Sequence, residues 1–360
     1  MTGGGIYPAI AVLQALENKN NHILWVGSEN GMEEKLLRNQ NLTFRAIPAA
    51  GLHGVSLIKT PGNLIKLYKG YQSARKLLDE FQPDVIFYTG GYVGVPLAFA
   101  NTRKIPSVVF IPDIEPGSAL RQILPKATII AVSNQESKNF VRYKEKTRIS
   151  GYPVRKDLLK WNRASGRKIF RIPNHAQVIF VFGGSKGSRS INQALMQNLK
   201  SLTQNYHIIH VSGEENWQTV KTNFDHLEQE VKDHYMIFPF LHDEMGAALA
   251  AADLVVCRAG ASTLGELPAF GLPAILVPYP YAWRYQIQNA QFLENNKGAV
   301  VVADNLLGSL LEEIIKEIFN QPDRLKTLKE NMKRLHQPQA AQRIAQYLVE
   351  ASRTECKEAR

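Results

Sequence analysis

Short, uninterrupted apolar runs rich in Val and Ile recur along the chain and alternate with segments of helical periodicity. An apolar run without polar alternation is typical of a parallel strand buried on both faces, because helices cover both sides of a parallel sheet. Such runs predict strands over Ile23–Val26, Val85–Tyr88, Ser107–Ile111, Thr128–Val132, Val178–Phe182, His207–Val211, Leu254–Cys257, Ala274–Val277 and Ala299–Val302. The alternation predicts an α/β protein with doubly wound parallel sheets.

Two glycine-rich segments indicate two domains of similar design. Thr2-Gly3-Gly4-Gly5 precedes a helix predicted to start near Pro8, and Gly183-Gly184-Ser185-Lys186-Gly187-Ser188 follows a predicted strand. The second segment is not a Walker loop, because Lys186 precedes the last glycine. A chain of 360 residues fits two domains. We predict an N-terminal domain over 1–152, a C-terminal domain over 153–337, and a final segment 338–360 whose helix packs back on the N-terminal domain.

The formal net charge of +11 is concentrated in the N-terminal half. Residues 57–76 hold five basic and no acidic side chains, and residues 121–168 hold thirteen basic side chains against three acidic ones. No zinc-ligand spacing, recognition-helix pattern or ribonucleoprotein motif accompanies this charge, so we expect no nucleic-acid partner. An anionic membrane surface would attract such a face. Because the sequence lacks an apolar run long enough to span a bilayer and a signal-peptide pattern, we expect a cytoplasmic protein.

The clearest indication of a ligand follows the run Leu254–Cys257. There the chain reads Arg258-Ala259-Gly260-Ala261-Ser262-Thr263-Leu264-Gly265-Glu266. Small residues at a strand end let backbone N–H groups approach a diphosphate, and the N-terminus of the next helix adds about half a positive charge. Glu266 can accept two hydrogen bonds from a ribose diol. The alternative interpretation is an ordinary strand-to-helix turn.

Six motifs in order along the chain resemble those of the MurG family. They are Thr2-Gly3-Gly4-x3-Pro8-Ala9, Gly90-Gly91-Tyr92-Val93, Gly151-x-Pro153-Val154-Arg155, Gly183-Gly184-Ser185-x-Gly187, Arg258-x-Gly260-Ala261-x-Thr263-x2-Glu266 and Pro278-Tyr279-x5-Gln286-x2-Asn289. Members of this family transfer N-acetylglucosamine to lipid I, giving lipid II in peptidoglycan synthesis. The resemblance implies a GT-B fold, in which two Rossmann-like domains face each other across a cleft. The C-terminal domain would hold UDP-N-acetylglucosamine, and the N-terminal domain the undecaprenyl-linked acceptor.

The resemblance also implies substrate-binding residues. Donor-contacting positions match Arg155, Ser185, Ala261, Ser262, Thr263, Leu264, Gly265 and Glu266, with Glu266 on the ribose; Gln286 matches a glutamine on the sugar hydroxyls. Leu241 or His242 matches the uracil-reading position, and a shift of one residue leaves both open. Thr2, Gly3 and Gly4 are assigned to substrate binding as well.

Side-chain chemistry gives independent reasons for several of these assignments. The planar guanidinium of Arg155 suits a phosphate, and Ser185 in a glycine turn offers a hydroxyl and backbone amides. Gln286 and Asn289 share a helix face and can present paired amides to sugar hydroxyls. The alternatives are a surface ion pair, a plain turn, and helix capping or a local hydrogen bond.

Two departures from the family pattern concern the catalytic base. Gly5 stands where relatives commonly have a histidine, and Asp113 stands where they often have asparagine. We hypothesise that Asp113, or alternatively Glu115, accepts the proton of the acceptor 4-hydroxyl in an inverting displacement, because both follow a strand at its carboxyl end. The alternative role is to cap a helix beginning near Pro116.

We expect no cofactor and no metal. There is no Asp-x-Asp pair beside the diphosphate loops, and helix N-termini with Arg155 can balance the charge of the leaving uridine diphosphate. Residues Leu57–Lys76 mix large apolar and basic side chains, the pattern of a segment that lies on lipid. An amphipathic helix packed on the sheet is the alternative. We therefore predict a peripheral protein on the cytoplasmic face of the bacterial plasma membrane, bound to its anionic surface.

Three other interpretations keep the same fold. The acceptor could be another lipid, the reaction could be nucleotide-sugar epimerisation, or the protein could be a catalytically silent nucleotide-sugar-binding scaffold. The last follows from Gly5 and from the N-terminus, because family members begin with a hydrophobic strand before the first glycine segment. Here that segment starts at Thr2, so we expect the first strand of the N-terminal sheet to be missing.

Overall fold

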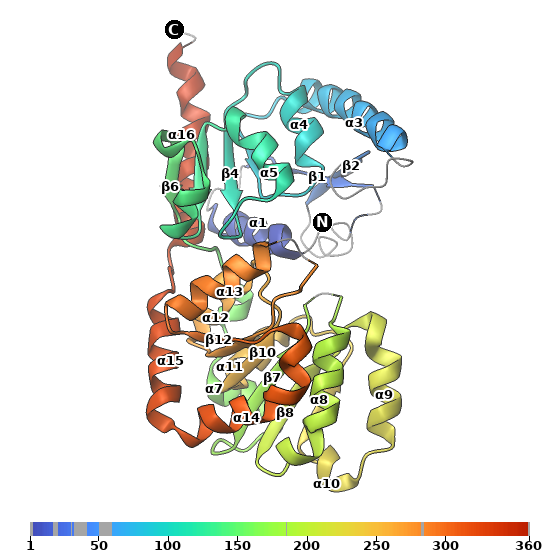
Figure 1. Cartoon of the computed structure of the whole chain (residues 1–360). Helices are drawn as coiled ribbons and strands as arrows, with labels where there is room; N and C mark the ends of the chain where they lie inside the picture. The colour runs from blue at the N-terminus through green and yellow to red at the C-terminus, as the bar shows by residue number, and fades with distance from the viewer. Residues whose placement is uncertain are drawn as a thin grey trace. The chain divides into compact units, whose positions relative to one another are not determined.

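The computed structural model of the chain (Figure 1) describes residues 3–16, 21–29, 31, 42–49, 60–184, 186–281 and 284–358. The chain forms two compact units. The first comprises Met1–Pro153 together with Gln339–Arg360, and the second comprises Val154–Pro338. The boundary therefore lies within one residue of the 152/153 junction that the sequence predicts.

The described strands of the first unit form two parallel sheets. One pairs β1 with β2, and the other has the order β3-β4-β5-β6. Its elements are α1 (Gly3–Ala15), β1 (Leu24–Ser28), β2 (Thr43–Ile47), α3 (Thr60–Phe81), β3 (Ile86–Tyr88), α4 (Gly94–Ala100), β4 (Ser107–Ile111), α5 (Ser118–Ile123), β5 (Ile129–Val132), β6 (Thr147–Ile149) and α16 (Ala340–Glu358). The expectation of a missing first strand stays a prediction.

Helix α1 begins earlier than the sequence indicates. Its first residue is Gly3, so the predicted start near Pro8 is wrong and the glycines occupy the first helical turn. Ile6 and Ile10, one turn apart, are both buried, and they share a face because of the helical repeat. The helix extends past Pro8 toward the N-terminus and carries Ile6 on the same buried face as Ile10.

Apolar packing fixes the strands and helices of the first unit. Every residue of β4 and β5 is buried, as expected for strands with a neighbour on each side. Helix α3 buries Gly70, Ala74 and Leu78, which recur every fourth residue and line one face. A Cβ on Gly70 would lie 2.1 Å from the Pro48 carbonyl oxygen, so only glycine permits this close approach.

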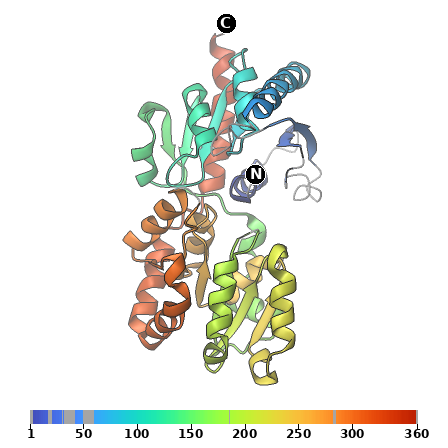
Figure 2. The same ribbon diagram turned by 45° about the vertical axis from the view of Figure 1, so that its right-hand side comes forward.

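The last helix, α16, packs within the first unit, beside α1 and β4 (Figures 1 and 2). Ile344 and Leu348 are buried, and Ala351 continues the same face. The Arg148 guanidinium of β6 donates two hydrogen bonds to the Glu350 carboxylate, at 2.5 and 2.7 Å. The helix thus returns to the unit in which the chain begins.

The second unit contains one six-stranded parallel sheet of order β12-β11-β10-β7-β8-β9. Its elements are α6 (Lys156–Leu159), α7 (Arg163–Ile169), β7 (Gln177–Phe182), α8 (Arg189–Leu202), β8 (Tyr206–Val211), α9 (Trp217–Asp225), α10 (Gln229–Lys232), β9 (Tyr235–Phe238), α11 (Met245–Ala251), β10 (Leu254–Cys257), α12 (Thr263–Phe270), β11 (Ala274–Leu276), α13 (Tyr285–Asn295), β12 (Ala299–Val301), α14 (Leu307–Asn320) and α15 (Pro322–Arg334).

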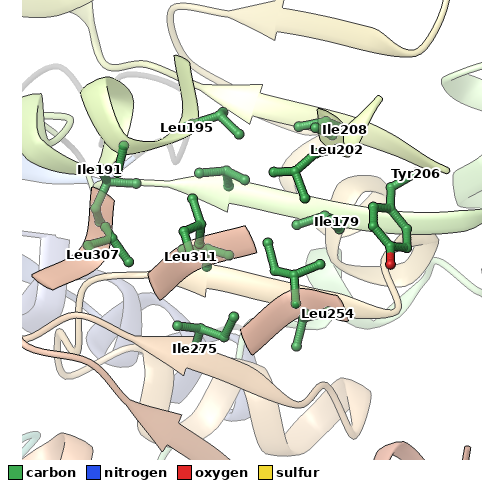
Figure 3. Close-up of a cluster of buried hydrophobic side chains, with 14 of the residues drawn as sticks. Ile179, Ile191, Leu195, Leu202, Tyr206, Ile208, Leu254, Ile275, Leu307 and Leu311 are labelled. Carbon is green, nitrogen blue, oxygen red and sulfur yellow. The ribbon is translucent and has the colours of Figure 1, made fainter. Parts of the chain in front are cut away.

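One core cluster of the second unit lies between this sheet and two helices, α8 and α14. Figure 3 shows Ile191 and Leu195 of α8, and Leu307 and Leu311 of α14, against apolar side chains of the strands. Helix α8 buries residues 191, 194, 195, 199 and 202, the spacing of one helical face. This packing holds the N-terminus of α8 at the end of β7.

Candidate functional site

Strand order locates the candidate ligand site of the second unit. Counted along the chain, the order β9-β8-β7-β10-β11-β12 reads 3-2-1-4-5-6, and it reverses direction between β7 and β10. In open α/β sheets, ligands bind outside the carboxyl ends of the strands at such a reversal. The loops that leave β7 and β10 there are the glycine segment after Phe182 and the segment after Cys257. The topology therefore joins the two motifs that the sequence singles out.

The loop after β7 requires its glycines. Gly184 and Gly187 have φ angles of +91° and +78°, a region that residues with a Cβ rarely adopt. A Cβ on Gly183 would lie 2.1 Å from the Ser188 nitrogen, whereas a Cβ on Gly184 would meet open space. The Ser188 hydroxyl caps α8 by accepting a hydrogen bond from the Ile191 N–H at 3.4 Å. Ser185 lies outside the described residues.

The loop after β10 leads directly into α12. Gly260 faces open space, and the Thr263 N–H donates to the Gly260 carbonyl at 3.0 Å. Ala261, Thr263, Leu264 and Gly265 are buried and Ser262 is half-buried, so the loop presents mainly backbone. The N–H groups of residues 263–266 donate to the carbonyls of residues 260–262, so an anion at this helix N-terminus would be bound by the N–H groups of 260–262.

Glu266 lies in the first turn of α12 and is 8% exposed. Burial raises the pKa of its carboxyl group to about 7, although the charge of Arg155 and a hydrogen bond with Ser262 act in the opposite direction. Arg155 is half-buried and immediately precedes α6. The structure thus brings together Arg155 and Glu266, which are far apart in the sequence.

Gln286 and Asn289 of α13 have different surroundings. Gln286 is half-buried, and its side-chain oxygen accepts the Tyr279 N–H at 2.9 Å, an arrangement that directs its NH₂ group elsewhere. Asn289 is fully buried and donates to the Ala259 carbonyl at 3.0 Å. Asn289 therefore supports the loop after β10, and direct contact with a sugar stays a prediction.

The two candidates for the uracil position follow β9. Leu241 is 7% exposed and His242 is exposed. The His242 ring lies 4.7 Å from the ring of Phe240. The backbone of either residue remains a candidate for base recognition.

The two carboxylates of the first unit also differ. Both follow β4; Asp113 is half-buried, whereas the Glu115 side chain is fully buried and forms an ion pair with Arg121. Arg121 also donates to the Pro116 carbonyl at 3.0 Å. The N-cap of α5 is Gly117, with no side-chain cap. Of the two carboxylates, Asp113 is the more exposed.

In the first glycine segment, Gly3 and Gly4 lie in the first turn of α1, and Thr2 lies outside the described residues.

Sequence reasoning missed a polar cluster in the second unit, formed by Arg258, Ser190 and Asp304. Each of the three residues follows a strand of the same sheet. This shared position is the sequence feature that could have predicted the cluster.

Comparison with known proteins identifies the family. The Glycosyltransferase family 28 N-terminal domain matches residues 2–119, and the C-terminal domain of the same family matches residues 178–344. A UDP-N-acetylglucosamine–N-acetylmuramyl-(pentapeptide) pyrophosphoryl-undecaprenol N-acetylglucosamine transferase from Halothermothrix orenii is 37% identical over 348 residues, covering 94% of each chain. The chain belongs to the MurG family. A MurG relative from Roseiflexus is 36% identical and covers 97% of this chain and 92% of its own.

Solved structures agree on the fold. Acinetobacter baumannii MurG superposes with a TM-score of 0.71 at 22% identity, covering 97% of both chains. Os79 from O. sativa, solved in complex with UDP, has a TM-score of 0.70 at 13% identity and likewise covers 97% of both chains. The chain is thus a MurG-family glycosyltransferase of GT-B fold.

Proposed function

We propose that the chain transfers N-acetylglucosamine from UDP-N-acetylglucosamine to the 4-hydroxyl of the muramyl sugar of lipid I, giving lipid II. The observation that carries the proposal is the meeting of the two predicted motifs at the strand-order reversal of the second unit, with Glu266 one turn into α12. The activity printed for the relatives, which match along nearly the whole chain, supports it.

The donor would be held chiefly by backbone groups. The glycine loop after β7 and the loop 260–262 before α12 would direct N–H groups at the diphosphate, and Gly184 and Gly260 leave room for it. Arg155 would add a positive charge to this region. The Glu266 carboxylate would accept hydrogen bonds from the ribose diol, and Gln286 would donate its NH₂ group to the sugar.

Asp113 would act as the general base. The acceptor hydroxyl oxygen attacks the anomeric carbon, its proton passes to the Asp113 carboxylate, and the bond from that carbon to the diphosphate oxygen breaks with inversion. The leaving uridine diphosphate keeps the bonding electrons, and the N–H groups around it stabilise its charge. Partial exposure supports Asp113, whereas the ion pair of Glu115 with Arg121 disfavours Glu115.

A transfer assay with labelled donor and a lipid I analogue, run with chelator, tests the proposal. The wild-type protein should transfer the sugar, and Asp113→Asn should lower kcat by about 10²- to 10⁴-fold, the usual contribution of a general base, without weakening donor binding. Glu115→Gln is the comparison, since it alters the neighbouring carboxylate and should keep kcat in folded protein. Unchanged turnover of Asp113→Asn would exclude it as base, and transfer only with added magnesium would exclude the metal-free mechanism.

Among the described residues, no helix is both long enough and apolar enough to cross a bilayer. We propose peripheral attachment through α3, with the active protein on the cytoplasmic face of the plasma membrane. Ile65 and Tyr68 of α3 are 58% and 62% exposed, and the basic residues Lys66 and Lys69 beside them are exposed as well. Exposed apolar side chains flanked by positive charge favour anionic lipid.

A further inference from the structure

Arg258 is a buried guanidinium that joins four loops of the second unit. It follows β10 directly and is 9% exposed. Its Nη1 donates to the Val277 carbonyl at 3.1 Å and to the Asp304 carboxylate, and its Nη2 donates to the Ser190 hydroxyl at 2.8 Å. The Ser190 hydroxyl donates in turn to Asp304 at 2.7 Å. The three side chains thus form a closed hydrogen-bonded ring.

Each partner of Arg258 follows a different strand at its carboxyl end. Ser190 lies in the first turn of α8, after the glycine loop of β7; Val277 follows β11; and Asp304 follows β12. Arg258 itself precedes Gly260 and the start of α12. One side chain therefore connects the exits of four neighbouring strands, two of which carry the diphosphate loops.

Through Tyr279, Arg258 is also connected to Gln286, the side chain proposed to bind the sugar. The Arg258 Cζ lies 5.2 Å from the centre of the Tyr279 ring. The Tyr279 N–H in turn donates a hydrogen bond to the side-chain oxygen of Gln286. A planar guanidinium can stack on a ring and donate in several directions of its plane at once, whereas a lysine ammonium cannot reproduce this fork. The geometry therefore depends on arginine rather than on a positive charge alone.

We propose that Arg258 is a positioning residue for the donor site: it fixes the glycine loop, the start of α12 and the Tyr279–Gln286 contact relative to one another, so that all three reach the same nucleotide sugar. The inference rests on the proposed function and adds a residue to it. Arg258 is not required to contact the donor. Its effect passes through Ser190, Asp304 and Val277.

Arg258→Lys tests the inference, with Arg163→Lys as the matched control. The Arg163 guanidinium also donates a hydrogen bond to a buried carboxylate, that of Asp253. Asp253, however, directly precedes β10 and so lies at the amino end of the strand, whereas Arg258 lies at the carboxyl end. Arg258→Lys should raise KM for UDP-N-acetylglucosamine about tenfold, the loss of roughly one charge-assisted hydrogen bond. KM for the lipid acceptor should not change, and kcat should change less than KM for the donor. Arg163→Lys should leave both KM values unchanged.

Hydrogen exchange in the ligand-free protein gives a readout that does not depend on catalysis. Arg258→Lys should speed exchange at Lys186–Ser190, at 259–262 and at 279–281, whereas Arg163→Lys should not. Ser190→Ala removes two of the three hydrogen bonds of the ring. It should speed exchange in the same segments if Arg258→Lys does not fold. Equal exchange and equal donor KM in folded Arg258→Lys and wild-type protein would overturn the inference. A wild-type protein that does not bind UDP-N-acetylglucosamine would instead overturn the proposed function, whatever the exchange pattern.

Discussion

At the scale of the residue, Glu266 links donor binding to pH. Burial raises the pKa of its carboxyl group to about 7, and ribose hydroxyls bind the carboxylate better than the acid. Binding should therefore weaken as the pH falls through 7, with Kd for UDP-N-acetylglucosamine rising roughly tenfold between pH 8 and pH 6. Calorimetry at several pH values measures this change, and buffers of different ionisation enthalpy should detect proton release on binding near pH 7.

Glu266→Gln supplies the control for this prediction, because it keeps the shape of the side chain and removes its titration. Its Kd should be higher at pH 8 and nearly constant down to pH 6. If the wild-type protein and Glu266→Gln showed the same pH dependence, the titrating group would not be Glu266.

At the scale of the element, an ion cluster at the start of β10 connects two helices, α7 and α15, to the sheet. Asp253 is 4% exposed; it accepts hydrogen bonds from Arg163 and Arg167 of α7, from Lys329 of α15, and from the Val178 N–H at 3.0 Å. Burial alone would raise the pKa of Asp253, but the Arg163 hydrogen bond, the charges of Lys329 and Arg163, and the Val178 N–H together lower it.

Asp253→Asn should destabilise the protein by about 3 kcal/mol, because it leaves the fully buried guanidinium of Arg167 without its counter-charge. Since the folded-state pKa is lowered, the stabilisation is present above the unfolded-state pKa of about 4 and is lost as the pH falls through the lower folded value. Chemical unfolding at pH 7 and pH 3 measures both effects. Asp225→Asn, in an exposed pair with Lys221, should change stability by less than about 0.5 kcal/mol; equal losses would refute a special role for Asp253.

The strands show what the sequence could predict about the elements. The predicted strands Ser107–Ile111 and Leu254–Cys257 have the bounds of β4 and β10, because strands buried on both faces form nearly continuous apolar runs. Three described strands, β2, β6 and β9, were missed. All three lie at sheet edges and are at least partly exposed, so they carry polar residues or short apolar runs that do not stand out from helix or loop.

The sequence predicts a role where a residue's type suggests one, and the role stays a prediction. Glu266 after a small-residue loop indicates a ribose, and its burial in α12 fits that assignment. The partner that a side chain finds in the fold was not predictable. Asn289 bonds Ala259 instead of facing outward beside Gln286, and Glu115 pairs with Arg121; both contacts depend on packing that the local pattern does not encode.

At the scale of the whole molecule, the proposed attachment to the membrane depends on α3. The helical repeat places Ile65, Tyr68, Lys69 and Lys76 on one face, opposite the buried face of Gly70 and Ala74. The net charge of +11 would favour approach to anionic lipid, and the exposed side chains of Ile65 and Tyr68 would add apolar contact with it.

Flotation with vesicles of anionic and of neutral lipid tests whether this face of α3 binds the membrane. The protein should bind only the anionic vesicles, and binding should fall with salt because screening shortens the reach of the charges. The double variant Lys69→Glu with Lys76→Glu should weaken binding at least about tenfold, since each basic residue near lipid contributes about 1 kcal/mol. Ile65→Ser with Tyr68→Ser should weaken it with little change in the salt dependence. Val349→Ser on α16, 41% exposed, is the control and should bind as the wild type does; binding that no α3 variant altered would place the attachment elsewhere.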